Sequence, residues 1–226
     1  VADDSVIGPR VGKQKQEGLY WVEYHPVGGD ADREALLAAL DYVTGLDQVE
    51  GRLTPDEGIY FINLTADEAR KVLELLPDAA ETDFERSVSC VGKARCQIGM
   101  QDSAGLLKDV VAAVKEAGVD MNFVPRMHIS GCPSSCGTHQ VGPLGFQGSI
   151  KLVDKVPTPA FAVFEGGSEH YDNAGFGMPI ATVAASRIPD MMVELGKKLQ
   201  AANATDFYAW KEANHEELVA FVKSYE

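Results

Sequence analysis

The segments Ser-Cys-Val-Gly-Lys-Ala-Arg-Cys (residues 89–96) and Gly-Cys-Pro-Ser-Ser-Cys-Gly (residues 131–137) contain every cysteine of the chain. The first segment spaces its two cysteines as C-x5-C and the second as C-x3-C. The four residues are Cys90, Cys96, Cys132 and Cys136. Four thiolates with none left over match the ligand count of a four-iron cluster. We therefore expect the protein to be organised around the stretch from Ser87 to Gly148.

Three kinds of site could use these cysteines. Structural zinc usually takes knuckles with two to four residues between the cysteines, and C-x5-C is wider than that. Free or disulfide-bonded cysteines fit two close pairs poorly in a chain without a recognisable secretory signal. An iron–sulfur cluster is favoured by the ligand count and by glycines beside three of the cysteines, because a cluster needs close backbone approach and N–H donors to sulfur. These glycines are Gly92, Gly131 and Gly137.

The composition narrows the class of protein and of partner. With 226 residues, 45% of them hydrophobic, the chain is long enough for one large or two small globular domains. The formal net charge of −14 argues against nucleic acid and anionic membranes as partners. No apolar run approaches the roughly 18 residues of a membrane span. These features favour a cytoplasmic protein in a reducing compartment.

The first third of the chain has the order strand, helix, strand, strand, helix, which is typical of a ferredoxin-like unit. The aromatic and β-branched composition of residues 18–24 predicts a strand, whereas polar residues 1–17 are expected to form an irregular arm. Asp30 is a candidate cap for the first helix, and Thr65-Ala-Asp-Glu68 is a capping box for the second. The predicted elements are a helix at 32–43, strands at 49–53 and 59–64, and a helix that Pro77 closes.

The remainder of the chain predicts an α/β domain around the cysteines. A helix capped by Asp102 or Ser103 carries one apolar stripe and ends at Gly118. Three glycines at 142, 145 and 148 predict a tight loop, and Gly166-Gly167 a turn. The other predicted elements are strands at 121–130, 150–153 and 160–164, a helix from Pro189 to about 201, and a last helix within 206–225. The fold class is thus α+β, with an arm at 1–17, a ferredoxin-like half-domain at 18–86 and a cluster-binding domain at 87–226.

C-x5-C followed by Gly-Cys-Pro-x-x-Cys resembles the sirohaem and four-iron cluster motif of the sulfite and nitrite reductase family. The similarity continues through residues 18–76, the loop 141–148, Gly166-Gly167 and the helix start at 187–189. It implies a 4Fe-4S cluster held by all four cysteines. It also implies that the last of them, Cys136, binds the sirohaem iron from below and leaves the opposite position open for sulfite or nitrite.

Sirohaem is a polycarboxylate and the substrate is an anion, so the resemblance implies a basic pocket. Arg126 and His128 alternate with Ser130 along a predicted strand and therefore share a face. Together with Arg86 they are our candidates for anion clamp and proton source around the open axial site. A solvated surface charge is the alternative for each of them. Further candidates for cofactor binding are Arg52, Lys93, Arg95 and Lys151.

The sequence departs from the family pattern in places. Asp56 stands where the family's substrate half has a second arginine, and Ser134 stands where an asparagine is common. The common enzymes also contain two repeats per chain, whereas this chain has one. His139 and His170 are weaker site candidates, because a lone histidine is as often packed or solvated.

These features predict a small, single-repeat, assimilatory-type oxidoreductase that carries out the six-electron reduction of sulfite to sulfide. No nicotinamide or flavin motif is present, so an external protein is expected to donate the electrons. The alternatives are nitrite reduction to ammonia, a monooxygenase of the corrinoid pathway, and an iron–sulfur electron-transfer subunit without sirohaem. A homodimer or a partner subunit is expected to cover the haem face that a second repeat covers in the larger enzymes.

Overall fold

The computed structural model describes residues 2–226, in which α-helices and two β-sheets form an α+β fold. The chain divides into two compact units, Val1–Thr82 and Asp83–Glu226. The expected α+β class is confirmed. The assignment of the two parts as half-domain and cluster domain stays a prediction.

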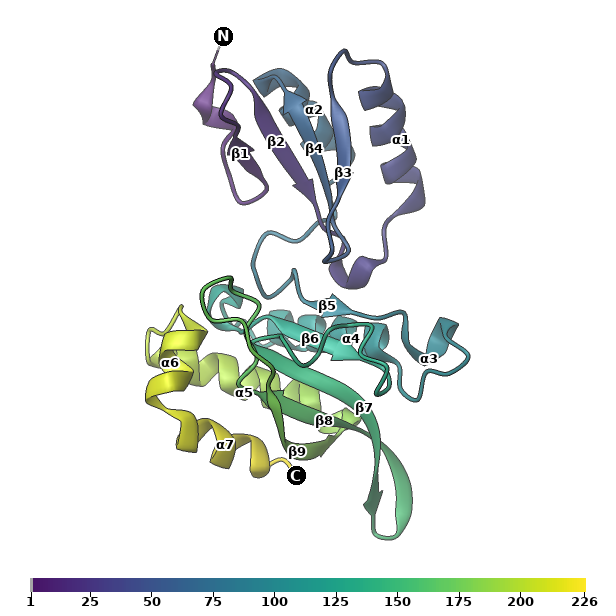
Figure 1. Cartoon of the computed structure of the whole chain (residues 1–226), viewed down its shortest axis with the longest axis vertical. Helices are drawn as coiled ribbons and strands as arrows, with labels where there is room; N and C mark the ends of the chain where they lie inside the picture. Colours follow the sequence, from purple (N-terminus) through teal and green to yellow (C-terminus); the bar gives the residue numbers. More distant parts are fainter. Residues whose placement is uncertain (1) are drawn as a thin grey trace. The chain divides into compact units, whose positions relative to one another are not determined.

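The first unit is an antiparallel sheet covered on one face by two helices (Figure 1). Its strand order is β1-β2-β4-β3, so β4 separates the two strands that α1 connects. This split arrangement is that of a ferredoxin-like unit. Buried Tyr20, Val22, Phe61 and Val72 lie in its core. The elements are β1 (Val11–Lys13), β2 (Tyr20–Tyr24), α1 (Arg33–Thr44), β3 (Glu50–Leu53), β4 (Ile59–Leu64) and α2 (Ala66–Leu75), with the 3-10 turns η1 (Asp4–Val6) and η2 (Val27–Gly29).

The expectation of an irregular arm at residues 1–17 is wrong, because β1 extends the sheet. Val11 pairs with Val22 and is 2% exposed, so this short strand contributes to the core. Gly12 packs against the indole of Trp21, and a Cβ at this position would lie 2.2 Å from a ring carbon. The strand was not recognised because three residues are too few to show an alternating pattern.

Two helix starts follow the predicted capping chemistry. The capping box at Thr65 is confirmed, since the Glu68 carboxylate accepts the Thr65 N–H at 2.8 Å and the threonine hydroxyl accepts the Glu68 N–H. The first helix is capped by Asp32 and not by Asp30. The Asp32 carboxylate accepts the N–H of Ala35 at 2.9 Å.

The second unit contains a five-stranded mixed sheet of order β5-β6-β7-β8-β9. β5, β6 and β7 are mutually parallel, while β8 and β9 join antiparallel. The strands are β5 (Val88–Ser89), β6 (Met127–Ser130), β7 (Leu144–Val153), β8 (Val156–Glu165) and β9 (Met178–Ala184). The helices are α3 (Gly92–Arg95), α4 (Ser103–Glu116), α5 (Ile188–Ala201), α6 (Phe207–Ala213) and α7 (His215–Lys223), with η3 (Met121–Phe123) and η4 (Ala185–Arg187).

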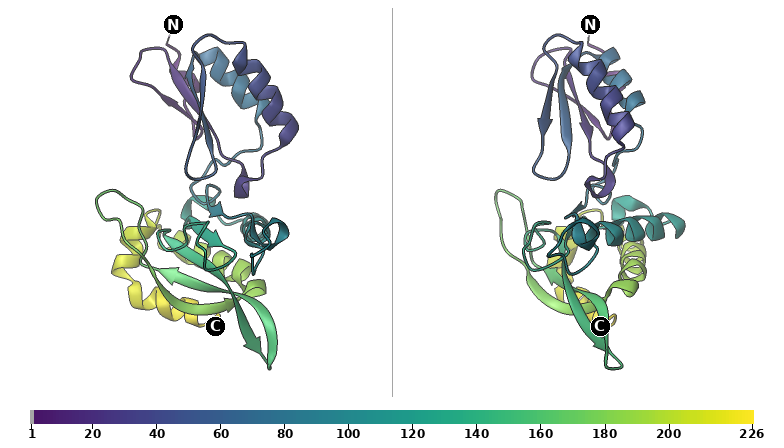
Figure 2. Two further views of the ribbon diagram at one scale, coloured as in Figure 1. Left: turned by 45° about the vertical axis from the view of Figure 1, so that its right-hand side comes forward. Right: turned by 90° about the vertical axis from the view of Figure 1, so that its right-hand side faces the viewer.

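The apolar stripe predicted for α4 packs as expected. Leu106, Leu107, Val110 and Val114 are buried, and α4 lies side by side with α5 (Figure 2). Asp102 caps α4 by accepting the N–H of Gly105 at 3.0 Å. Within residues 2–226, no helix combines the length and the apolar character that spanning a membrane requires.

The glycine-rich segment after the second cysteine motif is a strand and not the predicted tight loop. β7 runs without interruption from Leu144 to Val153. Gly145 and Gly148 are required because other backbone segments cross them closely. A Cβ would lie 1.8 Å from the His139 carbonyl oxygen in one case and 2.1 Å from that of Gly131 in the other.

Three further local predictions need correction. Of the strand expected at 121–130 only Met127–Ser130 pairs as a strand, because the Asp120 side chain accepts the N–H of Asn122 and starts the turn η3. The C-terminal helix is broken in two at Asn214, where the backbone is not helical. β9 was not predicted at all, since its residues are only partly buried and lack a clean alternation.

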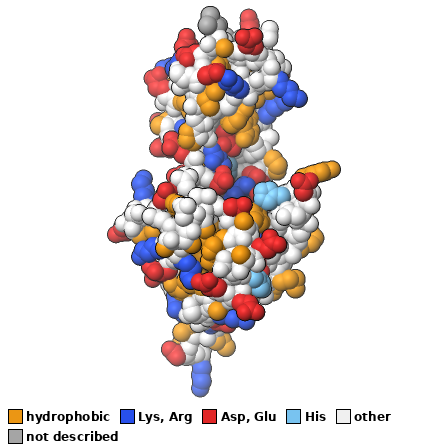
Figure 3. Space-filling model, turned by 90° about the vertical axis from the view of Figure 1, so that its left-hand side faces the viewer, with side chains coloured by type: hydrophobic (Ala, Val, Ile, Leu, Met, Phe, Trp, Pro, Cys, Tyr) orange, Lys and Arg blue, Asp and Glu red, His pale blue; other side chains and the backbone are white. Residues whose placement is uncertain are grey.

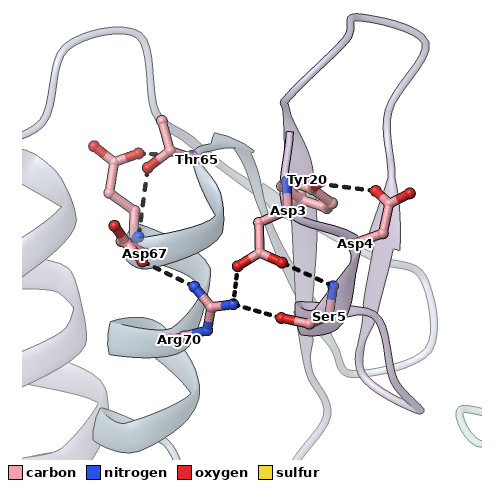
Figure 4. Close-up of polar contacts among 8 residues, drawn as sticks. Asp3, Asp4, Ser5, Tyr20, Thr65, Asp67 and Arg70 are labelled. Atoms are coloured by element: carbon pink, nitrogen blue, oxygen red, sulfur yellow. Dashed lines mark hydrogen bonds and ion pairs between the residues drawn. The ribbon is translucent and has the colours of Figure 1, made fainter. Parts of the chain in front are cut away.

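A polar cluster fastens η1 to α2 in the first unit (Figure 4). The Arg70 guanidinium donates to Asp67 and to the Ser5 hydroxyl, both at 2.8 Å, and pairs with Asp3. The bond from Arg70, supported by Ser5, lowers the pKa of Asp3 from its ordinary value of 3.8 to about 2. The deprotonated carboxylate is therefore the form that favours the folded state.

We predict that Asp3→Asn flattens the acid dependence of stability. A carboxyl group whose pKa falls on folding stabilises the protein fully above pH 3.8, and this contribution is lost as the pH falls toward about 2. The difference in melting temperature between the wild type and Asp3→Asn should thus narrow from pH 5 to pH 2, as followed by circular dichroism. Asp41→Asn, at an exposed position of α1, is the matched control. A difference that stays constant over this range would contradict the prediction.

Candidate functional site

All four cysteines line one small cavity of about 50 Å³ in the second unit. Cys90 directly follows β5, and Cys132 follows β6 after one residue. These strands are parallel neighbours, with Val88 opposite His128 and Ser89 opposite Ile129. Their carboxyl ends therefore meet at one edge of the sheet, and both cysteine motifs leave from that edge.

The first cysteine loop is a single helical turn held against the second loop. The Cys96 N–H donates to the Gly92 carbonyl at 2.8 Å across α3, so Cys90 and Cys96 face the same cavity. The Gly131 carbonyl oxygen accepts the N–H groups of Met100 and Gln101 at 3.0 and 2.9 Å. Backbone hydrogen bonds thus fix the two loops relative to each other without any metal.

The sulfur of Cys90 lies in a hydrogen-bonded environment. It accepts the Gly131 N–H at 3.1 Å, and the buried hydroxyl of Ser103 lies 3.1 Å away. This hydroxyl also donates to the Cys90 carbonyl at 2.7 Å. N–H and O–H donors stabilise a thiolate and tune a metal bound to it.

The glycines beside the cysteines were expected to allow close backbone approach to a cluster and to supply N–H donors to sulfur. The Gly131 N–H does donate to the Cys90 sulfur, and each glycine also lies in close contact with the protein's own backbone. A Cβ on Gly92 would lie 2.6 Å from the Ser103 nitrogen, and one on Gly131 would lie 2.6 Å from the Gln101 carbonyl oxygen. On Gly137 it would lie 2.1 Å from the Ile129 carbonyl oxygen. The glycines therefore allow the two loops to pack together at the sheet edge.

The cysteines surround the cavity and do not converge on one point. Among residues 2–226, no three Cys, His, Asp or Glu side chains are arranged so that a single ion could be held between them. Three of the cysteines are half-buried, whereas Cys136 is exposed. The sulfur of Cys136 is therefore the one most open to a group outside the cavity.

The three candidates for an anion clamp lie just before β5 and at the start of β6, and His128 contacts the turn after the second cysteine motif. The Arg126 Nε donates to the Arg86 carbonyl at 2.9 Å, and its Nη1 lies 2.9 Å from Glu169 Oε1. His128 is fully buried, and its Nε2 lies 3.8 Å from the same carboxylate oxygen. Its Nδ1 lies 2.8 Å from the Thr138 hydroxyl, two residues beyond Cys136. The Arg86 side chain is 16% exposed and lies 3.5 Å from Asp83.

The other predicted cofactor-binding residues lie in varied surroundings. Lys93 and Arg95 are exposed on α3, within the first cysteine loop. Lys151 lies on β7 and donates to the Thr182 carbonyl on β9 at 3.2 Å. Arg52 belongs to β3 of the first unit, is largely exposed and pairs with Glu50 at 3.0 Å. Their roles toward a cofactor stay predictions.

The two weaker histidine candidates have aromatic neighbours. His139 is buried, with Nδ1 2.9 Å from the Ser130 hydroxyl and its ring edge-on to Phe164. Burial lowers the pKa of His139, which favours a neutral, packed imidazole. His170 packs edge-on against Tyr208 at 4.8 Å.

Sequence reasoning missed three polar residues of the site. Ser103 was considered only as a helix cap, Thr138 was not singled out, and Glu169 was not considered. The signal for Thr138 was weak but present, because it lies two residues after a predicted ligand in a turn. The sequence contained no signal for Glu169, because its ion-pair partner Arg126 lies 43 positions away in the chain.

The surface of the molecule on the side of α6 carries mixed charge. Figure 3 shows acidic and basic side chains interspersed there, with histidine side chains among hydrophobic ones. No large basic field is visible on this face, although the pairing of Arg126 with Glu169 shows that positive charge is present locally. Positive charge in the site therefore comes from individual side chains, in a protein whose net charge is negative.

Comparisons with known proteins find nitrite reductases and sulfite reductases as relatives of this chain. A ferredoxin–nitrite reductase of Synechococcus elongatus is 29% identical over 80% of this chain and 36% of its own length. The chloroplastic ferredoxin–nitrite reductase of Betula pendula is 34% identical over 68% of this chain and 27% of its length. Sulfite reductase (ferredoxin) 1 of Mycolicibacterium paratuberculosis is 25% identical over 92% of this chain and 40% of its own length. No family model matches the chain.

The fold is also similar to a solved structure. The NirA protein of Mycobacterium tuberculosis superimposes with a TM-score of 0.66 and 23% identity, over 83% of this chain and 36% of NirA. This likeness concerns the fold. The chain belongs to the sulfite and nitrite reductase family. It spans 27% to 40% of the length of the curated relatives named above.

We predict that Gly137→Ala separates the second cysteine loop from β6. The added Cβ would overlap the Ile129 carbonyl oxygen, so the loop must shift, at a cost of about 3 kcal/mol in the free energy of unfolding. Gly175→Ala is the control, because its Cβ would meet no atom closer than 3.9 Å, and we expect a change below about 1 kcal/mol. Urea unfolding measures both values. Equal stability of the two variants would show that the close approach is not required.

Proposed function

We propose that this chain binds a 4Fe-4S cluster through Cys90, Cys96, Cys132 and Cys136. The observation that carries the proposal is the meeting of two cysteine loops around one cavity at the carboxyl ends of β5 and β6. The N–H of Gly131 directed at the Cys90 sulfur is the kind of donor that cluster sulfurs and thiolates require. The membership of the family supports the same cofactor.

The arrangement suits a cluster better than a zinc ion. Zinc needs four ligand atoms at about 2.0–2.3 Å from one centre. A four-iron cluster takes one thiolate at each of its irons, so its four cysteines stand apart. The four cysteines line one shared cavity, and the C-x5-C spacing of the first pair is wider than that of zinc knuckles.

We further propose that sirohaem binds beside the cluster, with Cys136 as the shared ligand. Cys136 is the exposed member of the four cysteines. When bound, the coupled cofactors supply electrons and an iron that binds the anion. The protein's own residues then have to hold the anion, orient it and supply protons.

Arg126, His128 and Arg86 are the residues we assign to these tasks. The guanidinium of Arg126 can bind an oxyanion or a haem carboxylate by charge-assisted hydrogen bonds. We assign proton supply to His128, whose Nδ1 is positioned by the Thr138 hydroxyl at 2.8 Å. Arg86 supports Arg126 through its carbonyl oxygen.

The reaction we propose is the six-electron reduction of sulfite to sulfide, with nitrite reduction to ammonia as the alternative. Both substrates occur in the names of the relatives, and the residues of the site suit either oxyanion. The same names point to a ferredoxin-type electron donor. We place the protein in the cytoplasm, and we propose that a second copy or a partner subunit completes the haem pocket.

The function predicts the metal content and the spectrum. The purified protein should contain about four irons and four acid-labile sulfides per chain, plus one iron in sirohaem, whose absorption bands separate a reductase from a simple electron carrier. Steady-state assays with sulfite and with nitrite, each with reduced viologen, identify the substrate. Stoichiometric zinc without labile sulfide would end the proposal, and a cluster without sirohaem would favour the electron carrier.

We predict that Cys136→Ser and Cys90→Ser differ in their effects on the two cofactors. Serine keeps the shape of cysteine but is a harder and poorer ligand for this iron. Cys136→Ser should change both the sirohaem and the cluster signals in electron paramagnetic resonance, whereas Cys90→Ser should first change the cluster signal. If magnetic coupling between haem and cluster persists in Cys136→Ser, another cysteine is the shared ligand.

A further inference from the structure

A carboxylate of the protein lies in the group of side chains that we assign to anion binding. Glu169 Oε1 lies 2.9 Å from Arg126 Nη1 and 3.8 Å from His128 Nε2, so one oxygen faces both residues. The Arg126 side chain is 19% exposed and that of Glu169 is 33% exposed. A partly buried guanidinium binds a carboxylate and a small oxyanion by the same hydrogen-bond geometry.

The loop between β8 and β9 fixes the backbone of Glu169. Its neighbour Ser168 is buried and exchanges two backbone hydrogen bonds with Gly175, at 3.0 and 2.9 Å. The Ser168 hydroxyl also bonds the Asn173 side chain at 2.8 Å. His170, on the other side of Glu169, packs on Tyr208 of α6. These contacts hold the loop closed at its base and so fix the backbone on both sides of Glu169.

We propose that Glu169 is the resident anion of this site and sets the affinity for the substrate oxyanion by competing for Arg126 and His128. The inference rests on the proposed function and adds a specificity-determining residue to it. An incoming oxyanion has to displace the Glu169 carboxylate, because two anions at one guanidinium and one imidazole repel each other. In the absence of substrate, the Glu169 carboxylate is a counter-ion for the partly buried Arg126 guanidinium.

Binding replaces one anion at Arg126, the Glu169 carboxylate, by another, the substrate oxyanion. The free energy of the Arg126–Glu169 pair is lost when the oxyanion binds, so it subtracts from the apparent affinity. Glutamine keeps the size and shape of glutamate but lacks its charge. Glu169→Gln should therefore release Arg126 and strengthen sulfite binding by about tenfold, which corresponds to about 1.4 kcal/mol.

The test is calorimetric titration of the purified, cofactor-containing protein with sulfite and, separately, with nitrite. Asp172→Asn removes the same charge from an exposed position of the same loop and is the matched control. It should leave the affinity unchanged, whereas Glu169→Gln should raise it. The double variant Glu169→Gln/Arg126→Gln shows whether Glu169 acts through Arg126. In the Arg126→Gln background, the gain from Glu169→Gln should disappear.

The outcomes separate this inference from the proposed function. Equal affinity of the wild type and Glu169→Gln for both anions would overturn the inference and leave the anion site standing. It would mean that a fixed group, such as a haem carboxylate, occupies Arg126. An equal gain in Asp172→Asn would also overturn it, because the effect would then be one of overall charge. Failure of every variant to bind sulfite or nitrite would refute the anion site itself. Melting temperatures confirm that each variant is folded.

Discussion

The parallel pairing of β5 with β6 is the constraint on which the site depends. Only two residues of β5 take part, yet their register fixes where Cys90 and Cys132 emerge. Ile129 has a central place in this arrangement. It pairs with Ser89, its carbonyl oxygen accepts the Cys90 N–H at 3.0 Å, and the same oxygen is what Gly137 has to avoid. The α4 crossover then allows the two cysteine motifs, far apart in sequence, to share one cavity.

An acidic protein can keep an anion site by pairing positive groups locally. The chain carries a net charge of −14, so its surface as a whole does not attract oxyanions. Within the site, Arg126 and His128 face one carboxylate oxygen of Glu169, and Arg86 has Asp83 nearby. Such internal counter-ions keep partly buried cations tolerable, and in the site that we propose they would make the binding of an oxyanion an exchange of anions.

The sequence was most informative where structure is local. Capping residues and apolar stripes predicted α2 and α4, and a proline in the first turn predicted α5. The spacing of the cysteines predicted which residues share a cavity. It was least informative where distant segments decide the outcome. β1 and β9 are strands because they pair with the longer strands β2 and β8. The glycines of β7 resemble loop glycines in the sequence, and only the backbone segments that cross them in the fold show why they are needed. Glu169 belongs to this second kind, since only the folded chain brings it to Arg126.

The turn that follows the second cysteine pair connects the two parts of the site physically. Ser135 and Thr138 adopt left-handed backbone conformations, with φ of 60° and 50°, and the Thr138 N–H donates to the Ser135 carbonyl at 2.9 Å. This tight turn carries the Cys136 sulfur at one end and the hydroxyl that orients His128 at the other. Non-glycine residues in this conformation are strained, and they persist because the surrounding contacts hold them. If Cys136 is a metal ligand and His128 supplies protons, as we propose, a single turn of three residues would connect metal ligation to anion chemistry.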